Sequence, residues 1–148
     1  MRGSVLLCLL LASTAAAAKP ILTATCGSPT GTRYGYSRAG LQTGKDDFTN
    51  VNPVFVLDSD KRGKLLVIFG ATQNARNLGV ATQADEAAIV AMSPEKITAV
   101  LVTQPNGIVE TFSLFPTEGV MFYVKQFYLN RAETSAQIVT MWAKCTFA

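Results

Sequence analysis

Two cysteines, Cys26 and Cys145, have the clearest chemistry in this chain, because together they can form a disulfide bond. A third cysteine, Cys8, lies in an N-terminal apolar run that we expect to be removed. The remaining even count allows one internal pairing, with free thiols or an intermolecular bond as the alternatives. In the chain-entropy model, closing so long a loop stabilises a fold by about 5 kcal/mol. No C-x-x-C spacing is present, which argues against a redox-active pair.

Histidine is absent from the chain. Its absence excludes Ser-His-Asp and Cys-His catalysis, zinc sites built on histidine, and haem held by a proximal histidine. Two cysteines cannot complete a four-cysteine zinc site. Any general acid or base would have to be Asp, Glu, Lys, Tyr or Cys. We therefore expect no catalytic residues, no metal site and no cofactor.

Adjacent carboxylates occur twice, at Asp46-Asp47 and at Asp85-Glu86. Neighbouring residues in a strand point to opposite faces, so neither pair forms a catalytic dyad by itself. A glycosidase would need two carboxylates that face each other across a substrate. A hydrolase that works through carboxylates is therefore only a minor alternative.

The segment Asp58-x-Asp60-x-x-Gly63 resembles the start of a calcium-binding loop. An EF-hand also needs an oxygen ligand at its fifth position and a glutamate at its twelfth. Arg62 and Phe69 stand at those positions. The segment is therefore interpreted as a polar turn.

Aromatic side chains supply the remaining candidate surface. On the last predicted strand, Trp142 lies on the side opposite Cys145, and Tyr34 and Tyr36 share one side of an early strand. A bond from Cys26 to Cys145 would bring these two strands close together. An exposed surface of Tyr34, Tyr36 and Trp142 would then suggest a binding site, because such residues dominate interface energetics. The alternative is that they pack beneath a loop.

The N-terminus predicts a secretory signal peptide over residues 1–18. Arg2 gives a positive start, an unbroken apolar run follows, and four alanines end at Ala18, where we place the cleavage. The run is too short to cross a bilayer, which takes about 20 residues. We expect a secreted or periplasmic protein without a transmembrane anchor, in a compartment where disulfides persist.

Composition predicts one folded domain over residues 19–148. The chain has 148 residues, of which 49% are hydrophobic and 16% are charged. Without Arg2, 12 basic and 10 acidic side chains remain, giving a net charge of +2. Because nucleic-acid binding usually needs a basic patch, a charge this small and dispersed does not predict it.

Short β-prone runs separated by turn residues fill the rest of the chain. We interpret 28–31 as a turn and 39–47 as a loop. The segment 83–92 is a strand of a hairpin, with a short helix as the alternative because its alanines favour helix. The other predicted strands are 21–27, 32–37, 53–57, 64–69, 97–103, 108–115, 120–129 and 136–147.

About eight or nine such strands predict an all-β fold, an antiparallel meander in which sequential strands are neighbours. A disulfide from the first strand to the last favours closure into an up-and-down barrel, complete or flattened, over a β-sandwich. The layout resembles small barrels of the lipocalin type in outline only, and no motif places the chain in a named family.

Three functions remain open at this point. The first is an exported, non-catalytic β-domain that binds a small apolar ligand or a protein partner. A cavity in the interior would favour the ligand, whereas a filled interior with an exposed aromatic surface would favour the protein partner. The others are a structural or envelope-associated protein without a ligand, and the carboxylate-based hydrolase.

Overall fold

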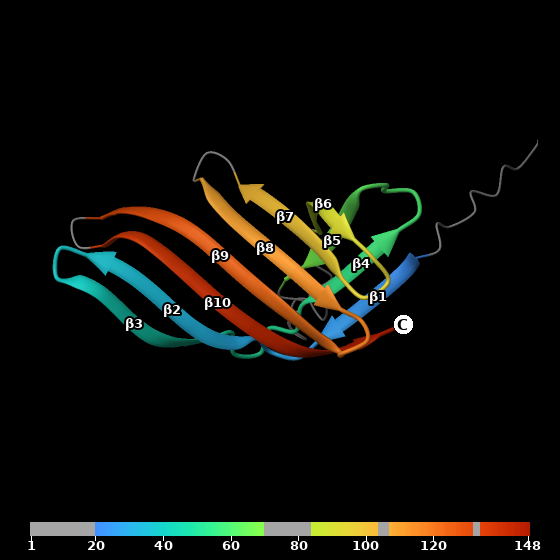
Figure 1. Cartoon of the computed structure of the whole chain (residues 1–148), viewed down its shortest axis with the longest axis horizontal. Helices are drawn as coiled ribbons and strands as arrows, with labels where there is room; N and C mark the ends of the chain where they lie inside the picture. The colour runs from blue at the N-terminus through green and yellow to red at the C-terminus, as the bar shows by residue number, and fades with distance from the viewer. Residues whose placement is uncertain (1–19, 70–83, 104–106, 132–133) are drawn as a thin grey trace, which may run out of the picture.

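The computed structural model describes residues 20–69, 84–103, 107–131 and 134–148 (Figure 1). These residues contain no helix, so the helical alternative for 83–92 is wrong from Asp85 onwards, and residue 83 lies outside the described part. The strands are β1 Pro20–Cys26, β2 Thr30–Ser37, β3 Gly40–Asp47, β4 Val54–Asp58, β5 Lys64–Ile68, β6 Asp85–Met92, β7 Ile97–Thr103, β8 Ile108–Phe115, β9 Val120–Arg131 and β10 Thr134–Phe147.

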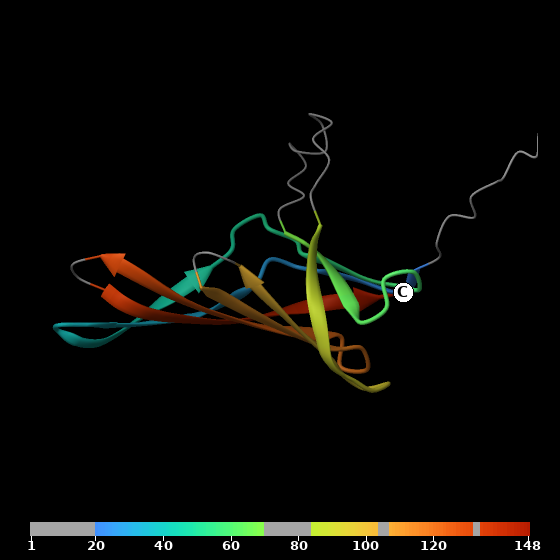
Figure 2. The same ribbon diagram turned by 90° about the horizontal axis from the view of Figure 1, so that it is seen from above.

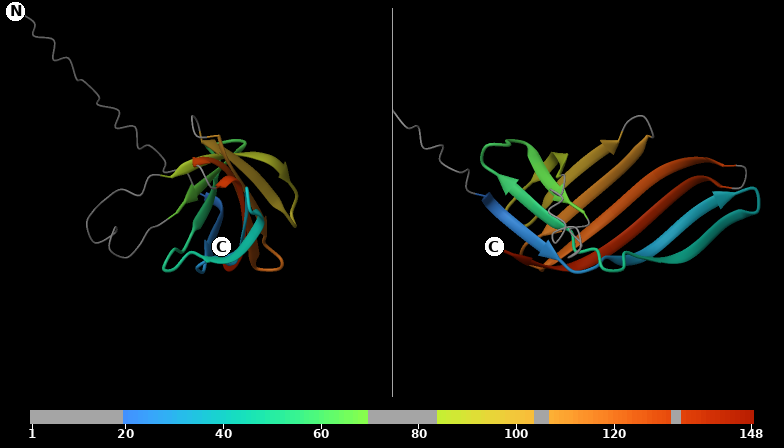
Figure 3. Two further views of the ribbon diagram at one scale, coloured as in Figure 1. Left: turned by 90° about the vertical axis from the view of Figure 1, so that its left-hand side faces the viewer. Right: turned by 180° about the vertical axis from the view of Figure 1, so that it is seen from behind.

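Eight of the strands close into an antiparallel barrel, which confirms the predicted all-β fold and its closure. The order is β1-β4-β5-β6-β7-β8-β9-β10, and β10 pairs with β1 again. From β4 to β10 each strand lies beside its successor in sequence, as expected for a meander. The end-on view in Figure 3 shows the strands curving round a common interior.

The meander prediction is wrong between β1 and β4, because the hairpin β2–β3 leaves the barrel. β2 pairs with the first half of β10, while β1 pairs with the end of β10. Figures 1 and 2 show the hairpin running away from the barrel beside the long strands β9 and β10. β10 therefore belongs to both the barrel and this extension.

The predicted turn at 28–31 is also wrong, because β1 and β2 follow one another along the same edge of β10. Cys26 is paired with Cys145 and Thr30 with Trp142, so the three residues 27–29 between β1 and β2 lie opposite two residues of β10. One residue in excess is a β-bulge, which bends a strand without reversing it. Gly27 N donates to the Lys144 carbonyl oxygen at 2.9 Å inside this bulge.

The segment predicted as a loop at 39–47 is strand β3. Its eight residues pair with β2 in an unbroken register from Ser37–Gly40 to Thr30–Asp47. The sequence is polar and contains two glycines, so little in it favours a strand. β3 is therefore stabilised as a strand by its pairing with β2, which in turn pairs with β10, and not by its own strand propensity.

The barrel interior is filled by side chains that alternate along the strands. Ala24 and Cys26 on β1 are buried, as are Met141 and Ala143 on β10, whereas Trp142 is exposed on the opposite side of β10. Larger side chains complete the filling, with Phe55, Phe112 and Tyr123 each at most 1% exposed. The Phe112 and Tyr123 rings stack with their centroids 5.3 Å apart.

A disulfide joins Cys26 to Cys145, as predicted, across a sequence separation of 119 residues. The two cysteines are directly paired in the β1–β10 ladder. That ladder has three registered pairs, compared with ten between β9 and β10. The covalent bond therefore lies at the short seam where the barrel closes.

Candidate functional site

Exposed apolar side chains gather on the outer side of β2, β10 and β9. Directly paired residues in an antiparallel ladder point to the same side of the sheet. Ile138 is paired with Tyr34, and Trp142 is paired with Phe122. Because residues two apart in β10 share a side, these pairs lie on one surface. We call it the outer aromatic face, made of Tyr34, Tyr36, Leu41, Phe122, Ile138 and Trp142.

The structure brings together the three aromatic residues singled out in the sequence. Tyr34 is 39% exposed, Tyr36 61% and Trp142 44%. They share the outer side of adjacent strands, and their role in binding stays a prediction. Sequence reasoning missed Leu41, because its strand was interpreted as a loop, and Phe122, although alternation along its strand was a usable signal.

Charge is sparse on this face. Among the described side chains that point outward from β2, β8, β9 and β10, Lys144 is the one charged group. At the rim, Lys45 Nζ on β3 lies 2.7 Å from Asp47 Oδ2. Hydrogen bonds from Lys45 and Thr30 hold the pKa of the exposed Asp47 carboxyl below its usual value. The face is therefore suited to a partner whose facing surface is also uncharged.

On the inner side, three polar residues lie where the aromatic filling of the barrel ends. We call Glu110, Tyr123 and Lys125 the inner polar group. The Tyr123 hydroxyl donates a hydrogen bond to Glu110, and Lys125 Nζ lies 3.6 Å from Glu110 Oε1. Burial, followed by the hydrogen bond to the Glu110 carboxylate, raises the pKa of Tyr123 far above its usual value. Tyr123 therefore stays protonated and keeps donating to Glu110.

Stability is expected to fall above about pH 10, because Tyr123 titrates near that pH only in the unfolded chain. When folding raises the pKa of a group, its contribution to the free energy of unfolding is complete below the unfolded pKa. That contribution decreases as the pH rises above the unfolded pKa. Tyr123→Phe lacks the titrating hydroxyl, so its free energy of unfolding does not decrease for this reason. The difference in free energy of unfolding between the wild type and Tyr123→Phe should therefore become smaller above about pH 10. Urea unfolding from neutral pH to about pH 11 measures it. A Tyr34→Phe control removes an exposed hydroxyl instead, and an unchanged gap for Tyr123→Phe would contradict the prediction.

The adjacent carboxylates point to opposite sides, as predicted. Asp46 Oδ2 lies 3.4 Å from Arg33 Nε on the inner side, whereas Asp47 binds Lys45 on the outer side. Glu86 forms an ion pair with Lys61, while its neighbour Asp85 lines a cavity on the other side of the sheet. Neither pair offers two carboxylates to one substrate.

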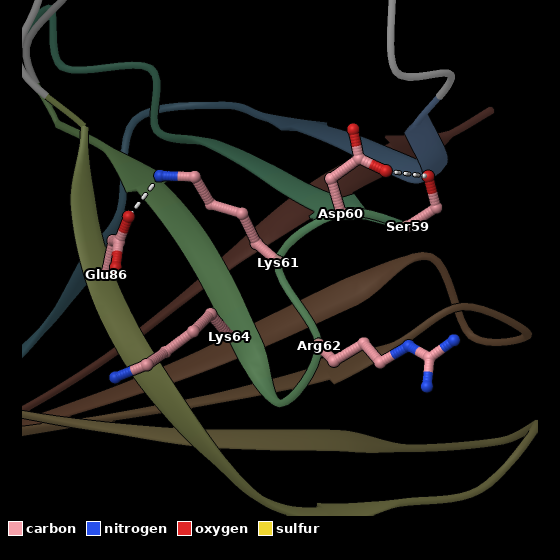
Figure 4. A pocket seen from close by; sticks show the side chains of 6 residues that line it. All are labelled: Ser59, Asp60, Lys61, Arg62, Lys64 and Glu86. Carbon is pink, nitrogen blue, oxygen red and sulfur yellow. Dashed lines mark hydrogen bonds and ion pairs between the residues drawn. The ribbon is translucent and has the colours of Figure 1, made fainter.

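The basic turn between β4 and β5 does not form a convergent site. Figure 4 shows Lys61 reaching towards Glu86, while Arg62 and Lys64 point in other directions. The hydrogen bond from Lys61 lowers the pKa of the exposed Glu86 carboxyl. Over the described ranges, no group of three or more His, Cys, Asp or Glu residues is placed to hold a metal ion.

No family model, curated protein or solved structure matches this chain. Within the described residues there is also no helix of the length and apolarity needed to cross a membrane. The outer aromatic face and the inner polar group are thus interpreted from their own geometry. The first offers apolar contact area, and the second offers charge beside aromatic rings.

Proposed function

We propose that this chain is an exported, non-catalytic β-domain that binds a protein partner through an extended segment added to the free edge of β3. The partner would also cover the outer aromatic face. The observation that carries the proposal is the continuity of the two surfaces, because Leu41 on β3 is 68% exposed and belongs to that face. The N-terminal apolar run and the disulfide support export.

The filled interior supports a protein partner over a ligand inside the barrel. Side chains with less than 2% exposure occupy the interior, including Phe55, Leu65, Phe112, Leu114, Met121 and Tyr123. By contrast, Tyr36, Leu41, Phe122 and other apolar residues are at least half exposed on the outside. Contiguous exposed apolar surface of this kind is typical of interaction sites.

β3 is suited to receive a strand. Among the described strands it pairs with β2 alone, so its other edge has free backbone groups. Phe48 N, just past β3, donates to the Pro29 carbonyl oxygen at 2.9 Å, on the side of β2. Backbone groups alternate sides along a strand, so those of Leu41, Thr43 and Lys45 point to the free edge. β3 has no proline and no bulge, two of the devices that block such an edge, and its one lysine, Lys45, forms an ion pair with Asp47.

The charges near this edge are already paired, which defines the chemistry of the segment that fits. Lys45 binds Asp47, and Asp46 binds Arg33. An added strand would therefore place uncharged side chains beside Leu41 and Thr43 on the outer side. Backbone hydrogen bonds provide affinity in this mode of recognition, and alternate side chains provide specificity.

A labelled peptide of alternating valine and threonine, with lysine at each end, is the probe for this edge. We expect saturable binding and slower amide hydrogen exchange at Leu41, Thr43 and Lys45. Thr43→Pro removes an N–H that faces the free edge and not β2, so it should weaken binding by about tenfold, roughly 1.4 kcal/mol. Leu41→Ser should weaken binding through lost apolar contact.

Met92→Ser is the matched control for Leu41→Ser, because Met92 is 63% exposed on a different hairpin. Equal binding by Thr43→Pro and the wild type, or protection spread over other strands, would overturn the proposal. Self-association is checked first by analytical ultracentrifugation without peptide. A dimer that Thr43→Pro abolishes would identify the occupant of the edge as a second copy of the chain.

A further inference from the structure

A cavity of about 340 Å³ opens at one mouth of the barrel, away from the outer aromatic face. Its volume is at the lower end of the range for small-molecule sites. Phe48 and Val51 come from the connection between β3 and β4, and Phe69 directly follows β5. Asp85 on β6, Glu110 on β8, and Tyr123 and Lys125 on β9 complete the lining.

Three aromatic rings form one wall of this mouth cavity. The ring centroids of Phe69 and Tyr123 are 5.5 Å apart, and those of Phe48 and Tyr123 are 6.0 Å apart. Phe48 and Phe69 meet edge to face at 6.2 Å. Rings held against one another in this way give a fixed apolar surface. Their faces also attract cations, because an aromatic ring has a negative face.

Among the described residues in and beside the cavity, the charged side chains form ion pairs except for one carboxylate. Lys125 and Glu110 lie 3.6 Å apart, and Arg33 and Asp46 nearby lie 3.4 Å apart. Asp85 is exposed at the cavity and makes no ion pair with any residue of the described ranges. Of the described charged residues that line the cavity, Asp85 and Glu110 are acidic and Lys125 is basic, so this lining has one more carboxylate than ammonium group beside its aromatic wall.

We infer that the mouth cavity binds a small organic cation with an apolar body, such as an aromatic or alkyl amine. The ammonium group would lie near Asp85 and the apolar body against Phe48, Phe69 and Tyr123. An anion would be repelled by the excess carboxylate of the described lining, and a neutral ring would not compensate its charge. This site is independent of the β3 edge, so either assignment can fail without the other.

Titration of the protein with benzylammonium, followed by NMR of the backbone amides, tests the inference. We expect saturable shifts concentrated at Phe48, Val51, Asp85 and Lys125. Benzyl alcohol, which has nearly the same shape without charge, should bind about fivefold more weakly, roughly 1 kcal/mol, and benzoate more weakly still. Shifts that do not saturate, or that are the same for benzoate, would overturn the assignment.

Asp85→Asn then tests the role of the Asp85 carboxylate. Because Asp85 is exposed, the variant should fold normally, and its amide spectrum verifies that. It should lose about fivefold in benzylammonium affinity and leave benzyl alcohol binding unchanged. Asp60→Asn removes an equivalent charge from the distant β4–β5 turn and should change neither affinity. Retention of the cation preference in Asp85→Asn would refute the inference.

Discussion

Replacing both Cys26 and Cys145 by alanine is expected to lower the free energy of unfolding by up to about 5 kcal/mol. The bond closes a loop over a separation of 119 residues, and without it the unfolded chain regains the entropy that closing this loop removes. The native state loses less, because each substitution removes one sulfur atom and only Cys26 of the two residues is buried. Since small domains have total stabilities of about 5–15 kcal/mol, this is a large fraction of the whole.

The seam of the barrel makes this loss harder to compensate. Three registered pairs join β1 to β10, supplemented by reciprocal bonds between Thr23 and Ala148 at 2.8 and 2.9 Å. Urea unfolding measures the effect as a lower midpoint. The slope should increase as well, because an unfolded chain without the bond exposes more surface.

Reductant provides the control for the cysteine variant. Reduced wild-type protein should unfold at the midpoint of the double variant, and reductant should not change the variant itself. An unchanged midpoint in both comparisons would mean that the β1–β10 seam is held by its backbone bonds and packing alone.

Gly31→Ala is expected to destabilise the pairing of β2 with β10 by about 3 kcal/mol, because the strands approach too closely for a side chain. A Cβ atom on Gly31 would overlap the Thr140 carbonyl oxygen and lie 2.7 Å from Met141 Cα. Both are backbone atoms, so no side-chain rotation relieves the contact. The glycine follows the bulge at 27–29, where the first strand bends across β10.

Hydrogen exchange is the measurement that shows where this damage occurs. Amides of β2 and β3 should lose protection, whereas amides of the disulfide-closed barrel should largely keep theirs. Gly44→Ala on β3 is the matched control, because a Cβ there would meet no atom within 4 Å. That control should be neutral or slightly stabilising, since alanine restricts the unfolded chain more than glycine does. Full protection of β2 in Gly31→Ala would contradict this account.

The two-residue periodicity of the sequence was sufficient to separate the two faces of the last strand. Alternation correctly placed Trp142 on the side opposite Cys145, and the cysteine pair correctly indicated closure. The segment Ser28-Pro29-Thr30-Gly31 has residues typical of a turn, and the turn predicted from them is wrong. The chain continues in one direction there because β1 and β2 both pair with β10. Nothing in the residues near the segment indicates that β10 is long enough to pair with both strands.

The candidate sites were predictable only in part, for the same reason. Tyr34, Tyr36 and Trp142 were grouped because the disulfide implied that their strands are close. Leu41 was missed because a polar, glycine-containing segment has little strand propensity of its own. The mouth cavity was not predicted, since Phe48, Asp85 and Lys125 come from separate strands and connections that only the curvature of the barrel brings together.

The position of the disulfide also determines how the molecule would bear mechanical load. Tension applied along the chain from both sides of the bridge passes directly from Cys26 to Cys145 through the sulfur–sulfur bond. The intervening strands, including the whole β2–β3 extension, would be shielded from that force. Only a force applied to the β2–β3 extension itself would load it. A force along the strand direction would shear the β2–β3 and β2–β10 ladders, so that their hydrogen bonds are loaded together. The bridge would thus let the domain transmit force while the β2–β3 extension remains unloaded and available to the proposed partner.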